Sequence, residues 1–101
     1  MISVNVSFIG KNIKKFIVSG HAEYDEIGKD LVCAGVSAVV IGGINALENE
    51  IANLSIINKK NEIGVDVIND NDKIQVILNT IYIQLKTIEE SYSKYIKINR
   101  N

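Results

Sequence analysis

Cysteine and histidine occur only once each in this chain of 101 residues, and proline does not occur at all. A lone cysteine cannot form an internal disulfide, and a short chain built for an oxidising compartment usually carries several, so we expect a cytoplasmic protein. The same scarcity argues against a multi-cysteine zinc site and against a histidine-based metal cluster. We therefore expect neither a bound metal nor another cofactor.

The sequence also lacks a marked excess of positive or negative charge, and it lacks long apolar runs. The formal net charge of -1 leaves no basic footprint for neutralising phosphates, which argues against direct nucleic-acid binding. No run of about eighteen uninterrupted apolar residues occurs, so a membrane span is not expected. Residues 1–6 lack the basic and apolar regions of a secretory signal.

What the chain does contain suits one soluble globular domain. Hydrophobic residues make up 47 % of the sequence and charged residues 23 %, which is enough apolar material for a core and an ordinary polar surface. A length of 101 residues leaves little room for a second domain. We therefore treat residues 1–101 as a single domain.

Period-two alternation of apolar and polar residues predicts four strands. Ile2, Val4 and Val6 share one face of the first strand, and turn signals separate it from the next alternating run. The two predicted antiparallel hairpins are formed by residues 2–8 with 13–21 and by residues 53–58 with 62–68. A last short strand is predicted over residues 95–98.

Helical spacing predicts two long helices between these strands. Residues 22–29 are polar and read as a loop, and Asp30 is a good N-cap for a helix from about Leu31 to about Asn53. The run 69–72 can cap a second helix that continues to about Tyr92. The order ββαββαβ, with antiparallel hairpins packed against two long helices, predicts a single small α+β domain.

Both helices carry a second feature besides their core-facing stripe. Many small residues lie inside the first helix, where each glycine costs about 1 kcal/mol relative to alanine, so this helix should pack very close to a sheet or a partner. On the second helix, Val76 and Ile83 lie off the apolar stripe and form a separate apolar patch.

The pair Cys33 and His21 is the strongest candidate for chemistry. Cys33 is expected in the first turn of a helix, where unpaired N–H groups and the helix dipole favour a thiolate. His21, expected at a strand end, could accept its proton. The backbone N–H groups of residues 32–34 could receive a developing oxyanion.

Each of these residues also has a plain structural explanation. A lone cysteine is most often a small packed hydrophobe, and a lone histidine at a strand end is most often solvated or hydrogen-bonded. Asp30 considered alone is an N-cap. Ser37, one turn after Cys33, could face the site or simply allow a tight contact. Physical reasoning alone leaves the pair suggestive.

The string from Gly20 to Ser37 resembles the signature of the ribosomal-processing cysteine protease (Prp) family. That signature is Gly-His-Ala at a strand end, a variable loop, and then Gly-x-Asp-[Ile/Leu]-Val-Cys-Ala-[Ala/Gly]-Val-Ser. The matching residues here are Gly20-His21-Ala22 and Gly28-Lys29-Asp30-Leu31-Val32-Cys33-Ala34-Gly35-Val36-Ser37. Outside the signature, the resemblance extends over nearly the whole chain in pattern and length.

The resemblance implies a cysteine endopeptidase that removes a short N-terminal extension from a large-subunit ribosomal protein during ribosome maturation. It implies Cys33 as the nucleophile, His21 as the proton acceptor and donor, and Asp30 as a residue that helps by capping or orientation. It also implies a homodimer, for which the patch at Val76 and Ile83 is suited, and a loop over residues 22–29 that closes on the substrate peptide.

Other functions remain open from the residues alone. A non-enzymatic ribosome-assembly factor could bind the same N-terminal peptide and use Cys33 only for packing. Another thiol reaction, such as thiol transfer or deamidation, is also compatible with one reactive cysteine. No third catalytic member is assigned, since a dyad is equally conceivable; the carboxylates that could serve are Asp25, Glu26, Asp30 and Asp66.

Overall fold

The computed structural model describes residues 1–20 and 27–101. The first hairpin forms the middle of the molecule. Its strands are β1 (Ile2–Ile9) and β2 (Asn12–Ser19), which pair antiparallel with Val4 opposite Val18. The predicted alternation is confirmed, because Val4 and Val18 are buried whereas Asn5 is exposed.

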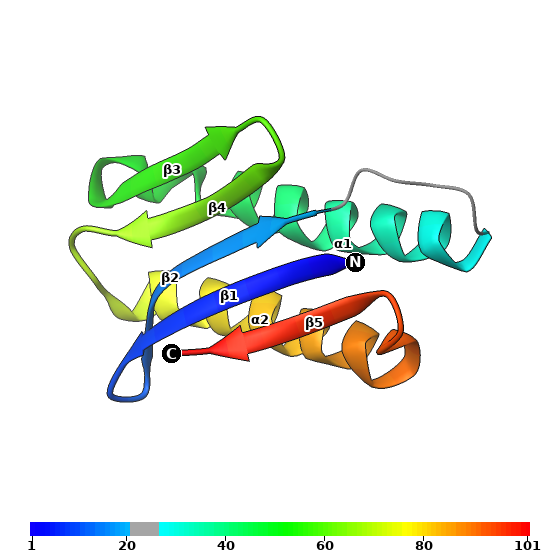
Figure 1. Cartoon of the computed structure of the whole chain (residues 1–101). Helices are drawn as coiled ribbons and strands as arrows, with labels where there is room; N and C mark the ends of the chain where they lie inside the picture. The colour runs from blue at the N-terminus through cyan, green and yellow to red at the C-terminus, as the bar shows by residue number, and fades with distance from the viewer. Residues whose placement is uncertain (21–26) are drawn as a thin grey trace.

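A five-stranded sheet grows outward from this hairpin in the order β3-β4-β2-β1-β5 (Figure 1). The second predicted hairpin is confirmed as β3 (Leu54–Lys59) and β4 (Glu62–Val67), and β4 joins the edge of β2. The last strand, β5 (Ile96–Arg100), lies parallel to β1 on the other side. The chain therefore has the predicted ββαββαβ order and α+β fold.

The first helix, α1 (Ile27–Ala46), differs from its prediction at both ends. It begins four residues earlier than Leu31, so residues 27–29 are helical and Asp30 lies in the first turn instead of at the N-cap. Its dipole stabilises an acidic side chain at either place, which is why sequence alone could not separate them. At its other end Leu47 is fully buried, and the chain continues as a 3-10 helix, η1 (Glu48–Asn53).

The second helix, α2 (Asp72–Tyr92), begins where the capping run predicted. The Asn71 side chain accepts a hydrogen bond from the Ile74 amide at 2.9 Å and so satisfies one of the unpaired N–H groups of the first turn. Most of the predicted stripe is buried or half-buried, whereas Tyr92 is exposed. Val76 and Ile83 project outward, with 67 % and 54 % of their surfaces exposed.

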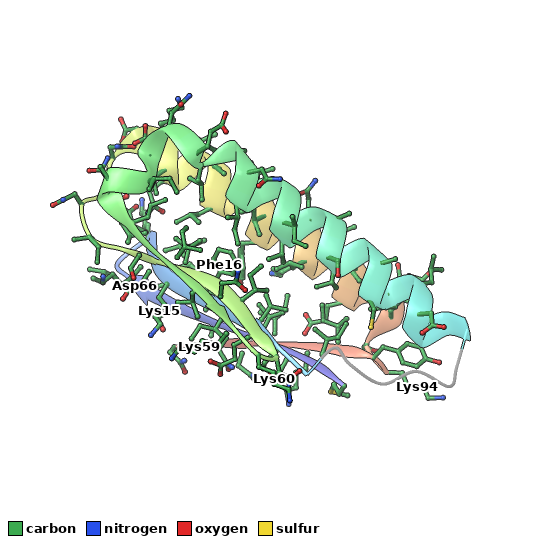
Figure 2. All side chains as sticks on the ribbon, turned by 90° about the horizontal axis from the view of Figure 1, so that it is seen from above. Lys15, Phe16, Lys59, Lys60, Asp66 and Lys94 are labelled. Carbon is green, nitrogen blue, oxygen red and sulfur yellow. The ribbon has the colours of Figure 1, made fainter. Side chains whose placement is uncertain are left out.

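Both helices lie against one face of the sheet, so the molecule has two layers (Figure 1). Seen from above, the apolar side chains fill the space between helices and strands (Figure 2). Close packing was predicted for α1 against a sheet or a partner, whereas the close contact at Gly43 is with the other helix: a Cβ there would collide with the side chain of Ile81 on α2. Neither helix, within the part of the chain that is described, is long and apolar enough to cross a membrane.

Candidate active site

Cys33 lies on α1 at the border between the buried and the exposed sides of the helix. Val32 and Val36 are buried and face the sheet, which fixes the rotation of this part of α1. The side chain of Cys33 is half-buried and packs against the core. A thiol in this position is held firmly by the helix and keeps part of its surface open to a reactant.

The start of α1 changes the expected source of oxyanion donors. Because α1 begins at Ile27, the N–H groups of residues 32–34 bond to carbonyls one turn earlier within the helix. Cys33 is thus the seventh residue of the helix instead of a first-turn residue, and residues 32–34 are not available as backbone donors.

Asp30 and Cys33 lie three positions apart on α1, so their side chains leave the helix on neighbouring parts of its surface. Asp30 is exposed. A carboxylate in the first turn is stabilised by the N-terminal end of the helix dipole. Asp30 is therefore within reach of groups near the thiol, and no hydrogen bond fixes its side chain among the described residues.

Gly20 ends the run that leads from β2 toward His21. Its φ is +80°, in the left-handed region, and a Cβ there would stand 2.5 Å from the carbonyl oxygen of Met1. Only glycine fits this combination of backbone angle and close approach. His21 lies outside the described residues, as do residues 22–26 of the predicted loop.

The start of β1 is fixed by a contact that no short-range sequence pattern indicated. The Ile2 amide donates a hydrogen bond to the Tyr95 carbonyl at 2.8 Å. This bond ties the strand beside Gly20 to the segment that enters β5. Residues far apart in the sequence therefore build the same end of the sheet, and only the parallel pairing of β5 with β1 reveals it.

Of the remaining candidate carboxylates, the structure describes Asp66, which lies away from the thiol. Asp66 accepts a hydrogen bond from Lys14 at 2.7 Å and pairs in register with Lys15, toward the end of β2 opposite Gly20. Asp25 and Glu26 lie outside the described residues. Within 1–20 and 27–101, no three His, Cys, Asp or Glu side chains group together in a way that could hold a metal ion.

Comparison with known sequences finds one family. A family model described as cysteine protease Prp matches residues 1–97. A relative from Staphylococcus aureus, named ribosomal processing cysteine protease Prp, is 37 % identical over 108 residues, covering 97 % of this chain and 95 % of the relative. The match includes the segments that carry Cys33, Gly20 and Asp30.

Solved structures are similar over the full length. The crystal structure of an essential ribosomal processing protease Prp from S. aureus in complex with a substrate peptide matches with a TM-score of 0.90 and 32 % identity, covering 100 % of both chains. The same S. aureus protease with a covalently linked product peptide matches with a TM-score of 0.88 and 33 % identity, again over 100 % of both chains.

Proposed function

This chain belongs to the cysteine protease Prp family, and from that premise we propose that Cys33 is the nucleophile with which it cuts a peptide bond. The supporting observation is the position of Cys33, a half-buried thiol two turns into α1 and next to the stripe that faces the sheet. A thiol that only filled the core would lie among the fully buried side chains, as Val32 does.

The proposed reaction is acyl transfer through a thioester. The Cys33 sulfur forms a bond to the substrate carbonyl carbon while His21 accepts the thiol proton. His21 then gives that proton to the leaving amine as the C–N bond breaks. A water molecule then gives a proton to His21 as its oxygen attacks the thioester carbonyl carbon; the S–C bond breaks, the acid product leaves, and His21 returns this proton to the Cys33 thiolate. Asp30 is proposed to orient His21.

We propose that the substrate is the short N-terminal extension of a large-subunit ribosomal protein precursor. The S. aureus relative is named for ribosomal processing, and its structure holds a substrate peptide. We further propose that this processing takes place in the cytoplasm.

We also propose a homodimer that forms through the outward surfaces of the two helices. Residues 31–46 of α1 contain no charged side chain, and Leu31 and Ile41 are exposed there. On α2, Val76 and Ile83 are exposed beside two threonines. The surface of α2 proposed for contact consists of Val76, Thr80, Ile83 and Thr87.

The two threonines make this surface easier to bury. Thr80 donates its hydroxyl to the Val76 carbonyl at 2.7 Å, and Thr87 donates to the Ile83 carbonyl at 2.8 Å. Both hydroxyls are satisfied inside the helix, so covering them would leave no donor without a partner. A second copy could therefore cover this surface at little cost in lost hydrogen bonds.

The decisive experiment incubates the protein with the candidate ribosomal-protein precursor and follows the precursor N-terminus by mass spectrometry. We expect wild-type protein to release the extension and Cys33→Ala to leave it intact while remaining folded by circular dichroism. Iodoacetamide should label Cys33 faster in the folded than in the denatured protein. If wild type and Cys33→Ala both bind the precursor and neither cleaves it, the result would instead support a peptide-binding assembly factor.

A further inference from the structure

Basic and acidic residues are divided unequally between the two layers of the described structure. The five strands and the turns inside the two hairpins carry seven basic residues and two acidic ones, whereas α1, η1 and α2 carry three basic residues and six acidic ones. The basic residues of the sheet layer are Lys11, Lys14, Lys15, Lys59, Lys60, Lys97 and Arg100. The formal net charge of -1, which argued against nucleic-acid binding, therefore conceals a basic sheet layer.

Three of these lysines project from the face of the sheet that the helices leave uncovered, which we call the open face (Figure 1). Successive side chains of a strand point to opposite faces, and Phe16 and Ile96 are buried on the helix side. Their neighbours Lys15 and Lys97 therefore lie on the open face. Figure 2 shows Lys15 and Lys59 on the side of the sheet away from the helices, with Phe16 toward them.

One row of register partners crosses all five strands of the open face, at the end where Gly20 follows β2. The row consists of Lys59, Glu62, Ser19, Ser3 and Lys97. A lysine thus stands at each end of the row, and both lysines are exposed. Neighbouring strands lie about 4.8 Å apart, so the main chains at Lys59 and Lys97 are about 19 Å apart.

The two acidic side chains of the open face do not cancel its positive charge. Asp66 lies beside Lys15 in the sheet but is bonded by the Lys14 ammonium at 2.7 Å, so Lys15 keeps its charge uncompensated. Glu62 lies between the strands of Lys59 and Ser19, and Lys60 follows Lys59 in the turn. Among the described residues, the lysines at the two ends of the row form no ion pair.

Hydroxyl and amide groups fill the space between these lysines. The Asn99 side-chain amide donates to Asn5 Oδ1 at 3.2 Å and lies 3.4 Å from Ser3 Oγ. Serine and asparagine side chains commonly bind the phosphate and sugar oxygens of nucleic acids, and the 2′-hydroxyl of RNA can both donate and accept. The strand positions of the open face, all of which are described, carry no aromatic ring on which an unpaired base could stack.

These features favour an extended polyanion with its phosphates on the outside. A single phosphate group could reach only one end of a row about 19 Å long. A surface that enters a membrane presents exposed aromatic or leucine side chains beside its lysines, and the described strands offer none on this face. The backbone of a nucleic-acid duplex presents phosphates over the required span and asks for no base stacking.

We propose that the open face, through Lys15, Lys59 and Lys97, is a docking surface for the backbone of double-stranded RNA. The inference goes beyond the proposed protease function and needs neither Cys33 nor cleavage. RNA is chosen over DNA because the proposed substrate belongs to a ribosomal protein. The row lies at the Gly20 end of the sheet, so a substrate held on the same RNA would be concentrated near the proposed catalytic pair.

The test measures binding of the full chain to a fluorescein-labelled RNA hairpin of about 20 base pairs by fluorescence anisotropy, between 50 and 200 mM KCl. We expect log Kd to rise with log salt with a slope of about 2–3, one phosphate for each lysine. The double variant Lys59→Gln/Lys97→Gln should lower this slope by about 2 and weaken binding at 50 mM KCl by about tenfold. A DNA hairpin of the same sequence should bind more weakly, because it lacks 2′-hydroxyls.

A second double variant separates the open face from the total charge. Lys73→Gln/Lys86→Gln removes the same two charges from exposed positions of α2, in the other layer. We expect it to keep the affinity and the salt slope of the wild type within about twofold. Circular dichroism verifies that both double variants are folded.

The outcomes separate RNA docking from the protease function. Absence of binding at 50 mM KCl would overturn the docking surface, and so would equal losses in the two double variants. Equal affinity for the DNA hairpin would overturn the assignment to RNA. Binding to phosphatidylglycerol vesicles without binding to RNA would overturn it in favour of a membrane. Cleavage of the precursor is measured without RNA, so failure of either proposal leaves the other standing.

Discussion

Gly20 lies directly against the main chain of Met1, where a Cβ would stand 2.5 Å from the carbonyl oxygen. We expect Gly20→Ala to lower the free energy of unfolding by about 1–3 kcal/mol, because it combines a left-handed backbone with a steric conflict. It should also lower kcat/KM by more than the loss of folded protein explains, since Gly20 directly precedes His21. Urea denaturation and peptide cleavage measure the two effects.

Gly10 provides the control for that substitution. Its φ is +60°, but a Cβ there would meet nothing within 4 Å. Gly10→Ala should therefore show only the backbone cost and keep wild-type kcat/KM. Equal losses of activity in the two variants would show that the contact with Met1 does not hold the strand end in place.

A second pair of glycines tests the packing of the helices. Gly43→Ala should destabilise the fold, because the new methyl group would collide with Ile81. Gly42→Ala should stabilise it by roughly 0.5–1 kcal/mol, because Gly42 has open space around it and alanine favours the helix. Thermal unfolding at one protein concentration compares the two, and stabilisation by Gly43→Ala would contradict the close contact.

The variants Asp30→Asn and Asp66→Asn test which of these two carboxylates acts in the reaction and which only stabilises the fold. Asp30→Asn should lower kcat with little change in KM, since its proposed work is to orient His21. Asp66→Asn removes the partner of Lys14 in a partly exposed pair, so it should cost about 0.5 kcal/mol or less and keep kcat. Steady-state kinetics and urea denaturation supply both readings; unchanged kcat in Asp30→Asn would remove Asp30 from the mechanism.

The dimer is tested by adding charge to one of two equally exposed residues. Val76 and Ile9 both have 67 % of their surface exposed, on α2 and at the end of β1 respectively. Val76→Glu should shift the protein toward monomer, because a buried charge in the contact would lack a partner. Ile9→Glu should leave the assembly unchanged. Analytical ultracentrifugation decides, and a dimer in Val76→Glu would rule out this surface.

Local patterns predicted the strands and the start of α2 correctly. Alternation marks Val4 and Val18 as core residues whatever their strand neighbours are, and Asn71 signals a helix start through its own side chain. The predicted ends of α1 were wrong by several residues. The helical spacing continued through Leu47, which is fully buried, but it contained no signal that α1 ends at Ala46 and that a 3-10 helix follows.

The candidate site was predicted only in its residue types. The signature string identifies Cys33 and Gly20, but the contact between Gly20 and Met1 depends on the pairing of β1 with β2 over the full strand length. A cavity of about 150 Å³ beside Ser37 takes part of its wall from β3, β4 and the turn between them, which follow much later in the sequence. Such long-range relationships carry no periodic signal in a single chain.

The parallel pairing of β5 with β1 also sets when this protein can begin to work. β1 is synthesised first, yet its second neighbour consists of residues 96–100, and the Ile2 amide finds its acceptor only at Tyr95. Until those residues have emerged from the ribosome, one edge of β1 stays unpaired beside the proposed catalytic end. Closing a loop of that length comes late in folding. A nascent copy would thus be unable to complete its sheet until residues 96–100 have left the ribosome.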